Sequence, residues 1–348
     1  MKYLGGAERR VQFAKVPRLK ANELRMQLAR ADAVNEGVRI VDQGDQVLIP
    51  LTTNGVAEAQ RIGLEIVASD PRTRIVARAP LPRIRVSVEV ADELKDLLPK
   101  KWELIGDVLV IRLPARLEPF REEIARGYAE ALNARTVCQE VGVIEGVHRT
   151  PKMRVIYGDG TETVHRENRI LYKLDVTKVM FSSGNKHEKQ RMAGLDCRGE
   201  TVVDMFAGIG YFTLPIAKHA KAKRVIACEI NPVAYRYLQE NVALNHVESI
   251  VEPVLGDNRT LPGKGFADRV LMGYVGTTHE FLPKALELVK AGGIIHYHCT
   301  CPVDQFPTRP TAEIDSAAEG RAIEILRADE VKSYAPAISH YVIDFQVL

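Results

Sequence analysis

The sequence predicts an α/β protein with a mostly parallel, doubly wound sheet in its C-terminal half, preceded by two smaller α/β or α+β modules. From about residue 186 onward, strand-like and helix-like segments alternate, which is typical of a parallel sheet covered by helices. The apolar segment 201–206 also runs through Asp204 into a turn that contains Gly208 and Gly210. A strand, a glycine-rich turn and a helix in this order let a nucleoside-bearing cofactor approach the main chain at the carboxyl edge of the sheet.

The elements of the C-terminal half follow from the spacing of apolar residues. The expected strands are 201–206, 224–228, 250–255, 267–273 and 294–299. The expected helices are 211–219, 232–245, 279–290 and 311–327, and a strand pair near 330–334 and 340–347 closes the order. These segments make a mostly parallel sheet, which places a ligand site at the carboxyl ends of its strands.

The chain is expected to divide into a small domain at 1–85, a β-rich domain at 86–180 and the doubly wound domain at 181–348, with Pro80 and Pro82 in a linker. In the first domain, an amphipathic helix is expected over 21–30 and strands at 37–41 and 46–50. In the second, the expected elements are strands at 84–88 and 107–112, a helix at 119–133, and a hairpin between 154–157 and 161–164 through Gly158 and Gly160.

Composition indicates an intracellular globular protein. The five cysteines, an odd number, do not suggest a disulfide framework, so a cytoplasmic location is expected. No apolar run reaches the roughly 18 residues of a membrane helix, and the N-terminus lacks an apolar signal core. Cys299 and Cys301 have poor spacing for zinc, so no metal site is expected.

Charge is distributed unevenly along the chain. Residues 1–200 carry 34 Lys and Arg against 28 Asp and Glu, whereas residues 201–348 carry 14 against 17. A polyanion is therefore expected to bind the N-terminal portion, since phosphate contacts need clustered cations. A solvated surface of mixed charge is an equally good interpretation of this count.

Polar residues end the second and third expected strands. Glu229 stands where a carboxylate accepts hydrogen bonds from the two ribose hydroxyls of a nucleotide cofactor. Asn231 is predicted to cap the next helix, with Pro232 at its first position. Asp257 and Asn258 offer an acceptor and a donor, which suit the amine and ring nitrogen of adenine. The alternatives are a surface acid at 229 and an ordinary turn at 257–258.

A polar stretch enters the doubly wound domain at residues 180–192. Ser182 is expected to cap a helix or to bind the cofactor. Lys189 and Arg191 are expected to neutralise a carboxylate of the cofactor, in charge-assisted hydrogen bonds. A solvated helix face is the alternative for these two cations.

Three residues are candidates for a catalytic role at the molecule that accepts the transferred group. Tyr274 follows the fourth strand, where an aromatic ring either stacks on a base or packs in the core. His296 and His298 alternate on the fifth strand and share one face, but a metal there would lack a third ligand. His279 is a further possible proton acceptor. The catalytic candidates are Tyr274, His279 and His298, and nothing in the sequence selects one.

Four stretches together resemble a known family, namely 178–189, 204–215, 256–259 and 267–274, and 292–298 and 331–340 fit the same pattern. They are similar to the wybutosine-pathway tRNA 3-amino-3-carboxypropyltransferases over about residues 90–348. The first 85 residues resemble the small extra domain of archaeal tRNA guanine-37 N1-methyltransferases, a sister family with the same core.

The resemblance implies a Rossmann-like class I methyltransferase fold with a seven-stranded sheet and S-adenosylmethionine as the group donor. The protein would transfer the aminocarboxypropyl group to C7 of 4-demethylwyosine at position 37 of tRNA-Phe, releasing methylthioadenosine, with the anticodon stem-loop as its partner. By the family pattern, Ser182, Lys189, Glu229, Asp257 and Asn258 contact the cofactor. The full set of expected cofactor contacts is Ser182, Lys189, Arg191, Asp204, Phe206, Gly208, Gly210, Glu229, Asp257 and Asn258.

Two departures separate this chain from the methylating sister family. Ser183 and Gly184 stand where that family carries Pro-Arg, and Gly273-Tyr274-Val275 stands where it carries Asn-Leu-Pro. The main alternative is still a methyltransferase that acts at position 37 of tRNA, on guanine N1 or on C7 of the wyosine base. A catalytically idle tRNA-binding protein is the other, and the intact set of expected cofactor residues argues against it.

Overall fold

The computed structural model describes residues 11–348 except 36, 44, 70–79 and 143–149. The chain divides into two compact units, Met1–Pro82 and Arg83–Leu348. The division into three domains with boundaries near 85 and 180 stays a prediction.

The first unit is a small antiparallel sheet with two helices. Its strand order is β2 (Val41–Asp42), β3 (Gln46–Pro50), β1 (Val11–Pro17) and β4 (Glu65–Ser69), with α1 (Ala21–Arg30) and α2 (Gly55–Arg61) in the connections. The helix over 21–30 and the strand over 46–50 are confirmed. The strand expected at 37–41 is wrong in its bounds, because only Val41 and Asp42 pair with β3.

The second unit begins with a four-stranded sheet in the order β5 (Trp102–Ile105), β6 (Val108–Ile111), β7 (Thr136–Glu140) and β8 (Met153–Tyr157). The helix α5 (Arg121–Leu132) is the one expected at 119–133, and the short helix α4 is Asp92–Lys95. The side chains of α5 that face the sheet, Ile124 and Tyr128 among them, form the core of this layer.

The strand expected at 84–88 is wrong, because α3 (Pro80–Ser87) is a helix. Ile84 and Val88 lie one helical turn apart and are buried, whereas Val86 between them is 84% exposed. An apolar residue at every second position fits a helix as well as a strand when only the outer two are buried. Val88 packs against α5 where Gly127 leaves room, since a Cβ at Gly127 would lie 2.6 Å from Val88 Cγ2.

The expected hairpin through Gly158 and Gly160 is also wrong. β8 pairs with β7, and β9 (Glu162–Glu167) pairs instead with β10 (Ile170–Asp175). Both glycines have positive φ, and Thr136 Oγ1 donates to Asp159 O at 2.6 Å, so this turn carries the chain from one sheet to the next. The observed hairpin turns at Asn168 and Arg169, and both have the positive φ that a two-residue type I′ turn requires.

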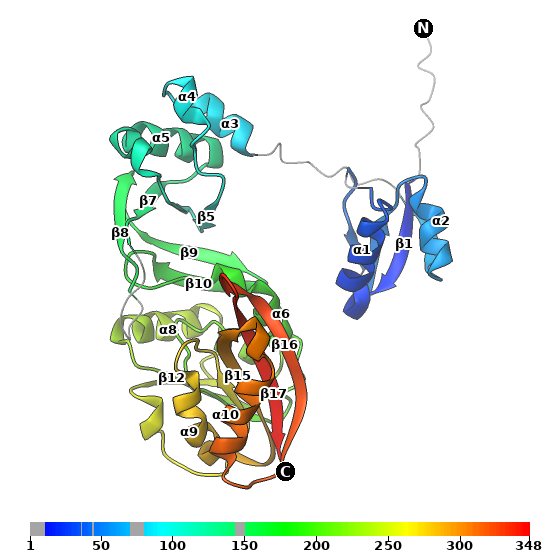
Figure 1. The fold of residues 1–348 in the computed structure, drawn as a ribbon, viewed down its shortest axis with the longest axis vertical. Coiled ribbons are helices and arrows are strands. Elements are labelled where there is room, and N and C mark those ends of the chain that lie inside the picture. The colour runs from blue at the N-terminus through cyan, green and yellow to red at the C-terminus, as the bar shows by residue number, and fades with distance from the viewer. Residues whose placement is uncertain (1–10, 36, 44, 70–79, 143–149) are drawn as a thin grey trace. The chain divides into compact units, whose positions relative to one another are not determined.

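The doubly wound sheet is confirmed, with seven strands in the order β13, β12, β11, β14, β15, β17, β16. In Figure 1 this sheet is found by the labels β12, β15, β16 and β17. The parallel strands are β11 (Thr201–Asp204), β12 (Arg224–Glu229), β13 (Val251–Leu255), β14 (Ala267–Met272) and β15 (Val289–Pro302), and β17 (Ile338–Val347) runs antiparallel to β15 and β16 (Ile323–Ala335). The connecting helices are α6 (Lys186–Ala193), α7 (Thr213–Lys218), α8 (Pro232–Leu244), α9 (Leu282–Leu288) and α10 (Thr308–Ala318). Separate apolar cores lie on the two faces of the sheet.

The last helix and strand differ from their expected bounds. The helix expected at 311–327 ends at Ala318, because Glu319 and Gly320 have positive φ and stop it. β16 then begins at Ile323 and is longer than the strand expected at 330–334. β15, β16 and β17 therefore extend past the end of β14, and the cavity described next has residues of this extension in its wall.

Candidate active site

A cavity of about 1510 Å³ lies at the carboxyl edge of the seven-stranded sheet. Its wall comes from the ends of β11 to β14, from residues 176–185 and from residues 96–112 of the four-stranded sheet. Sites for one small ligand usually measure about 300–1,000 Å³. The cavity therefore has room for a cofactor and a second, nucleobase-sized molecule.

The glycine-rich turn forms one edge of the cavity. Gly208, with φ 57°, donates its N–H to Glu229 Oε2 at 2.8 Å, and Gly210 has φ 104°. Asp204 lies below the turn, fully buried, where it accepts from Thr213 Oγ1 at 2.7 Å and from Phe206 N at 3.2 Å. Burial raises the pKa of Asp204 to about 6. Asp204 and Gly210 thus shape the turn without lining the cavity, whereas Phe206 and Gly208 line it.

The end of β12 fixes a carboxylate in the cavity wall. Glu229 Oε1 accepts from Asn231 N at 2.7 Å, so both carboxylate oxygens are held by backbone donors. Asn231 caps α8 as predicted, because its Oδ1 accepts from Val233 N at 2.9 Å. Each oxygen of Glu229 has a further lone pair, so the anchored carboxylate can still accept hydrogen bonds from a ligand.

The end of β13 contributes an acid and an amide. Asp257 Oδ1 accepts from Arg259 N at 2.9 Å, and the hydrogen bond with the Arg259 guanidinium lowers the pKa of Asp257. Asn258 is buried and donates Nδ2 to Met205 O at 2.7 Å. Its Oδ1 has no hydrogen-bond partner among the described residues, although Asn258 lines the cavity. A buried amide oxygen without a partner is costly, and a ligand that donates a hydrogen bond there removes the cost.

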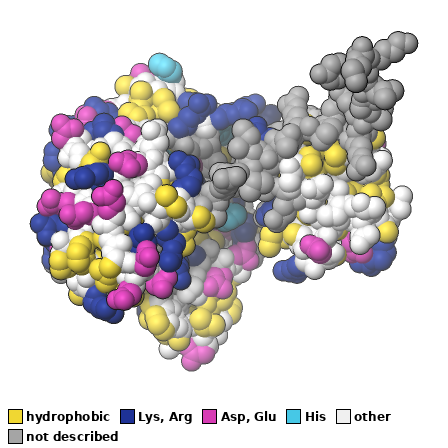
Figure 2. Space-filling model, turned by 90° about the horizontal axis from the view of Figure 1, so that it is seen from above, with side chains coloured by type: hydrophobic (Ala, Val, Ile, Leu, Met, Phe, Trp, Pro, Cys, Tyr) yellow, Lys and Arg dark blue, Asp and Glu magenta, His cyan; other side chains and the backbone are white. Residues whose placement is uncertain are grey.

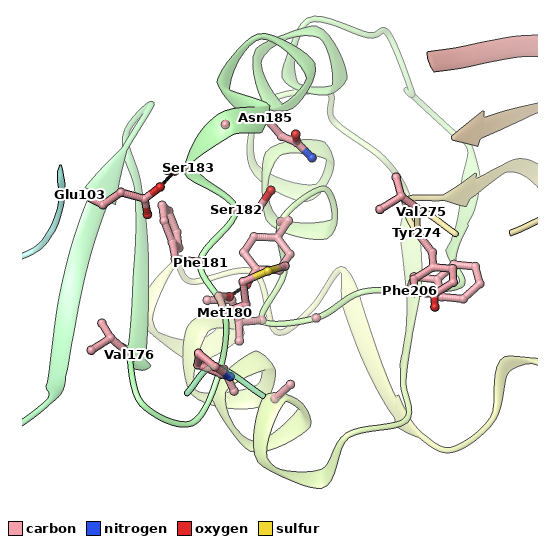
Figure 3. Close-up of a pocket in the computed structure, with 18 of the residues that line it drawn as sticks. Glu103, Val176, Met180, Phe181, Ser182, Ser183, Asn185, Phe206, Tyr274 and Val275 are labelled. Carbon is pink, nitrogen blue, oxygen red and sulfur yellow. Dashed lines mark hydrogen bonds between the residues drawn. The ribbon is translucent and has the colours of Figure 1, made fainter. Parts of the chain in front are cut away.

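The segment from Ser182 to Asn185 forms the opposite wall (Figure 3). Ser183 Oγ donates to Glu103 Oε1 at 2.7 Å, which ties this segment to β5. Asn185 Oδ1 is a second buried oxygen for which the described residues supply no hydrogen bond. Figure 3 shows Ser182 and Asn185 across the cavity from Phe206, Tyr274 and Val275.

Tyr274 belongs to an aromatic cluster in the cavity wall. Its ring stacks on Phe206, with centroids 5.2 Å apart and planes 16° apart, and Phe281 meets Phe206 edge-on at 5.0 Å. Tyr274 is half-buried, packs in this cluster and lines the cavity, and its stacking on a base stays a prediction.

Lys189 and Arg191 do not line the cavity. Lys189 Nζ lies 2.6 Å from Glu167 Oε1 and 4.5 Å from the centre of the Phe181 ring. Arg191 bridges Glu188 and Asp344, each at 2.5 Å. Both cations already have carboxylate partners inside the protein, so the structure does not bring them to the expected cofactor contacts.

The structure places the candidate histidines outside the cavity wall and a different histidine in it. His279 and His298 are outside the cavity wall, whereas His340, which the sequence did not single out, lines it. His340, Val342 and Asp344 alternate on the last strand, but the register that places them opposite Thr300, His298 and His296 of β15 is seen only in the structure. Other wall residues that sequence reasoning missed are Trp102, Glu103, Asn185, Lys332 and Tyr334.

The described part of the chain lacks two further features. It contains no cluster of three or more His, Cys, Asp or Glu side chains that could hold a metal ion. It also contains no helix long and apolar enough to cross a membrane.

Comparison with known proteins agrees with this geometry. The model of the TRM5/TYW2 methyltransferase domain matches residues 163–326, that of the TYW2 N-terminal domain matches 84–161, and that of the tRNA methyltransferase 5 N-terminal domain matches 15–55. A crystal structure of P. horikoshii TYW2 in complex with MeSAdo has a TM-score of 0.70 and 46% identity, covering 77% of this chain and 99% of that one. The fold and the cavity define a transferase of the class I methyltransferase type.

Curated relatives show to which branch of this class the chain belongs. The tRNA(Phe) (4-demethylwyosine(37)-C(7)) aminocarboxypropyltransferase of Pyrococcus horikoshii is 48% identical over 270 residues, which cover 76% of this chain and 96% of that protein. The chain belongs to the TRM5/TYW2 family, in the branch of these aminocarboxypropyltransferases. The tRNA (guanine(37)-N(1))-methyltransferase Trm5b of Pyrococcus abyssi is 36% identical and covers 96% of this chain and 98% of its own. The first unit therefore has its counterpart in the methylating branch.

Proposed function

We propose that this protein transfers the 3-amino-3-carboxypropyl group of S-adenosylmethionine to C7 of 4-demethylwyosine at position 37 of tRNA-Phe and releases methylthioadenosine. The observation that carries the proposal is the 48% identity that spans 96% of the Pyrococcus horikoshii aminocarboxypropyltransferase. Most of the cavity wall lies within residues 84–161 and 163–326, which match the TYW2 N-terminal domain and the TRM5/TYW2 methyltransferase domain.

The cavity wall fits S-adenosylmethionine. The anchored carboxylate of Glu229 suits the ribose hydroxyls, and Asp257 with the unpartnered Oδ1 of Asn258 suits the amine of adenine. Ser182 and Asn185 are placed to hold the polar end of the methionine tail, where Asn185 Oδ1 also lacks a partner among the described residues. The bound cofactor supplies an electrophilic carbon next to a sulfonium, and the protein supplies its orientation.

The tRNA partner is proposed to present its anticodon stem-loop to this cavity. A base must leave its stack to enter, at a cost of a few kcal/mol. Figure 2 shows Lys and Arg interspersed with Asp and Glu on the face drawn, so phosphate contacts would come from local cations. Lys100 and Lys101 are exposed cations in the cavity wall and suit that role. A cytoplasmic location, where tRNA is available, is part of the same proposal.

The second candidate is methylation at position 37, favoured by the Trm5b relative that covers 96% of this chain. The end of β14 argues for the first candidate. A Cβ at Gly273 would lie 2.7 Å from the Phe212 ring, so the Asn that the methylating family carries at this point has no room here. The wall beside the acceptor thus differs from that of a methyltransferase.

The test uses tRNA-Phe bearing 4-demethylwyosine and S-adenosylmethionine labelled in separate runs on the methyl or the carboxyl carbon. Carboxyl label in the tRNA, with methylthioadenosine released, is the expected result. Methyl label in the tRNA, with adenosylhomocysteine released, would establish the second candidate instead. A parallel run with unmodified guanine at position 37 separates the two acceptors.

A further inference from the structure

A chain of buried polar side chains runs from the cavity wall into the protein. His340 Nε2 lies 2.9 Å from His298 Nδ1, and His298 Nε2 lies 3.4 Å from Glu188 Oε1. All three side chains are at least 95% buried, and of the three only His340 lines the cavity. Phe212, whose ring stacks on His298 at 5.4 Å, stands between that histidine and the cavity.

The charged residues at the buried end of this series of side chains determine which ring nitrogen of each histidine carries the proton. Arg191 donates to both oxygens of Glu188, at 2.5 to 3.0 Å, so a guanidinium and a carboxylate are paired behind His298. A carboxylate next to His298 Nε2 favours a proton on that nitrogen, so His298 Nδ1 must accept from His340 Nε2. His340 is then left with a lone pair on Nδ1.

That lone pair is available to a ligand. The only side-chain hydrogen bond of His340 within the described residues is the one to His298, so Nδ1 has no protein partner there. Burial lowers the pKa of both His298 and His340 to about 3, which keeps both rings neutral before reaction. Lys332, on the neighbouring strand, also disfavours a charged His340.

We propose that His340 is a catalytic residue, whose Nδ1 accepts the proton that leaves C7 of the acceptor base, while His298 and Glu188 act as positioning residues behind it. This assignment rests on the proposed function. A Cβ at Gly273 would lie 2.7 Å from the Phe212 ring, and that ring stacks on His298, the partner of His340, so the histidine pair lies behind the part of the wall next to Gly273. None of the other candidates combines exposure to the cavity with an unprotonated nitrogen.

The step balances as a substitution. The new C–C bond forms with a π-electron pair of the base, and the carbon–sulfur bond breaks with its electrons left on sulfur. The C7–H electrons then return to the ring as the proton passes to Nδ1 of His340. The positive charge that His340 gains is shared with His298 across their 2.9 Å contact and is offset by the Glu188 carboxylate, 3.4 Å from His298 Nε2. A positioned base of this kind usually contributes about 10²–10⁴-fold.

The first test follows the leaving hydrogen. In a single turnover with tritium at C7, wild-type protein is expected to release methylthioadenosine and tritiated water together. His340→Gln is expected to release the tritium about 10²-fold more slowly than methylthioadenosine. Imidazole is expected to restore the rate in His340→Ala, because the residue lines the cavity. His187→Gln, an exposed histidine one residue before Glu188, is the matched control and should release both together.

The second test needs no turnover. The ¹⁵N spectrum of the histidine rings should show the proton on Nε2 in both His298 and His340, and methylthioadenosine should bind wild type and His340→Gln within twofold of each other. A proton on Nδ1 of His340, coincident release in His340→Gln, or a large loss of affinity in that variant would overturn the assignment. Wild-type protein that transfers the methyl label would overturn the proposed function alone, since the ring tautomers test His340 independently.

Discussion

Replacing Lys189 distinguishes two roles for that residue, a buried ion pair with Glu167 or a contact with the carboxylate of the cofactor. In the structure, its ammonium lies 2.6 Å from Glu167 Oε1, with side-chain exposures of 1% and 5%. Neither Lys189 Nζ nor the carboxylate oxygens of Glu167 form a hydrogen bond with any other described residue, so the two charges stabilise each other. Burial lowers the pKa of Lys189, and Glu167 opposes the shift. The rings of Tyr172, Phe181 and Tyr211 surround the cation at 4.5 to 5.9 Å.

Lys189→Met should remove the partner of a buried carboxylate and cost about 3–5 kcal/mol of unfolding free energy. The double variant Glu167→Gln, Lys189→Met should recover most of that stability, because no unpaired charge remains buried. Urea unfolding of the two single variants and the double variant measures the coupling. Lys223→Met, an exposed lysine that makes no contact with Glu167, is the control.

Cofactor affinity gives the decisive comparison. Because Lys189 does not line the cavity, calorimetry should show S-adenosylmethionine binding to folded Lys189→Met within about threefold of wild type. If this variant were as stable as wild type and bound the cofactor 10-fold or more weakly, the ion-pair account would be wrong. The sequence-based expectation, in which Lys189 holds the cofactor carboxylate, would then be correct.

Three further predictions concern the cavity and its support. Glu229→Gln should weaken S-adenosylmethionine binding by about 10–10²-fold, since each charge-assisted hydrogen bond contributes about 1.5–3 kcal/mol, whereas Glu252→Gln on the next strand, 53% exposed, should bind normally in calorimetry. Lys100→Ala with Lys101→Ala should reduce the slope of log affinity against log salt by about 1 for each phosphate that these lysines neutralise in wild type, measured by tRNA filter binding, and an unchanged slope would exclude both lysines. The folded-state pKa of Asp204, about 6, lies above its ordinary value of 3.8, so the stability it contributes is present at low pH and is lost as pH rises from about 4 to 6. Asp204→Asn should therefore flatten that part of the stability–pH curve by roughly 2–3 kcal/mol in urea titrations.

The sheet and the edge that carries the site could be predicted because their signals are local. Glu229 and Asn231 follow an apolar strand directly, and the cap geometry at Asn231 depends only on its own helix. The turn at Gly208 and Gly210 needs positive φ, which glycine supplies at low cost. Such features do not depend on distant partners.

Sequence-based predictions were wrong where contacts with residues distant in the sequence determine the local structure. The segment 84–88 is a helix because α5 buries only Ile84 and Val88, and the turn at 158–160 is not a hairpin because Thr136 holds it. The cofactor contact of Lys189 stays a prediction, and the sequence gives no sign that this lysine of α6 pairs with Glu167, which lies 22 residues earlier on β9. His340 reaches the cavity through the register of β17 on β15, which no local pattern of the sequence specifies.

The part of the cavity wall formed by Trp102, Glu103 and Arg112 limits how domains can be exchanged between members of this family. Those residues belong to the segment matched by the TYW2 N-terminal domain, outside the 163–326 that match the methyltransferase domain. A chimaera that grafts the seven-stranded sheet onto a foreign upstream domain would keep Glu229 and Asn258 but would leave Ser183 without Glu103. The compact unit that contains the whole cavity wall is therefore residues 83–348, and not the methyltransferase domain alone.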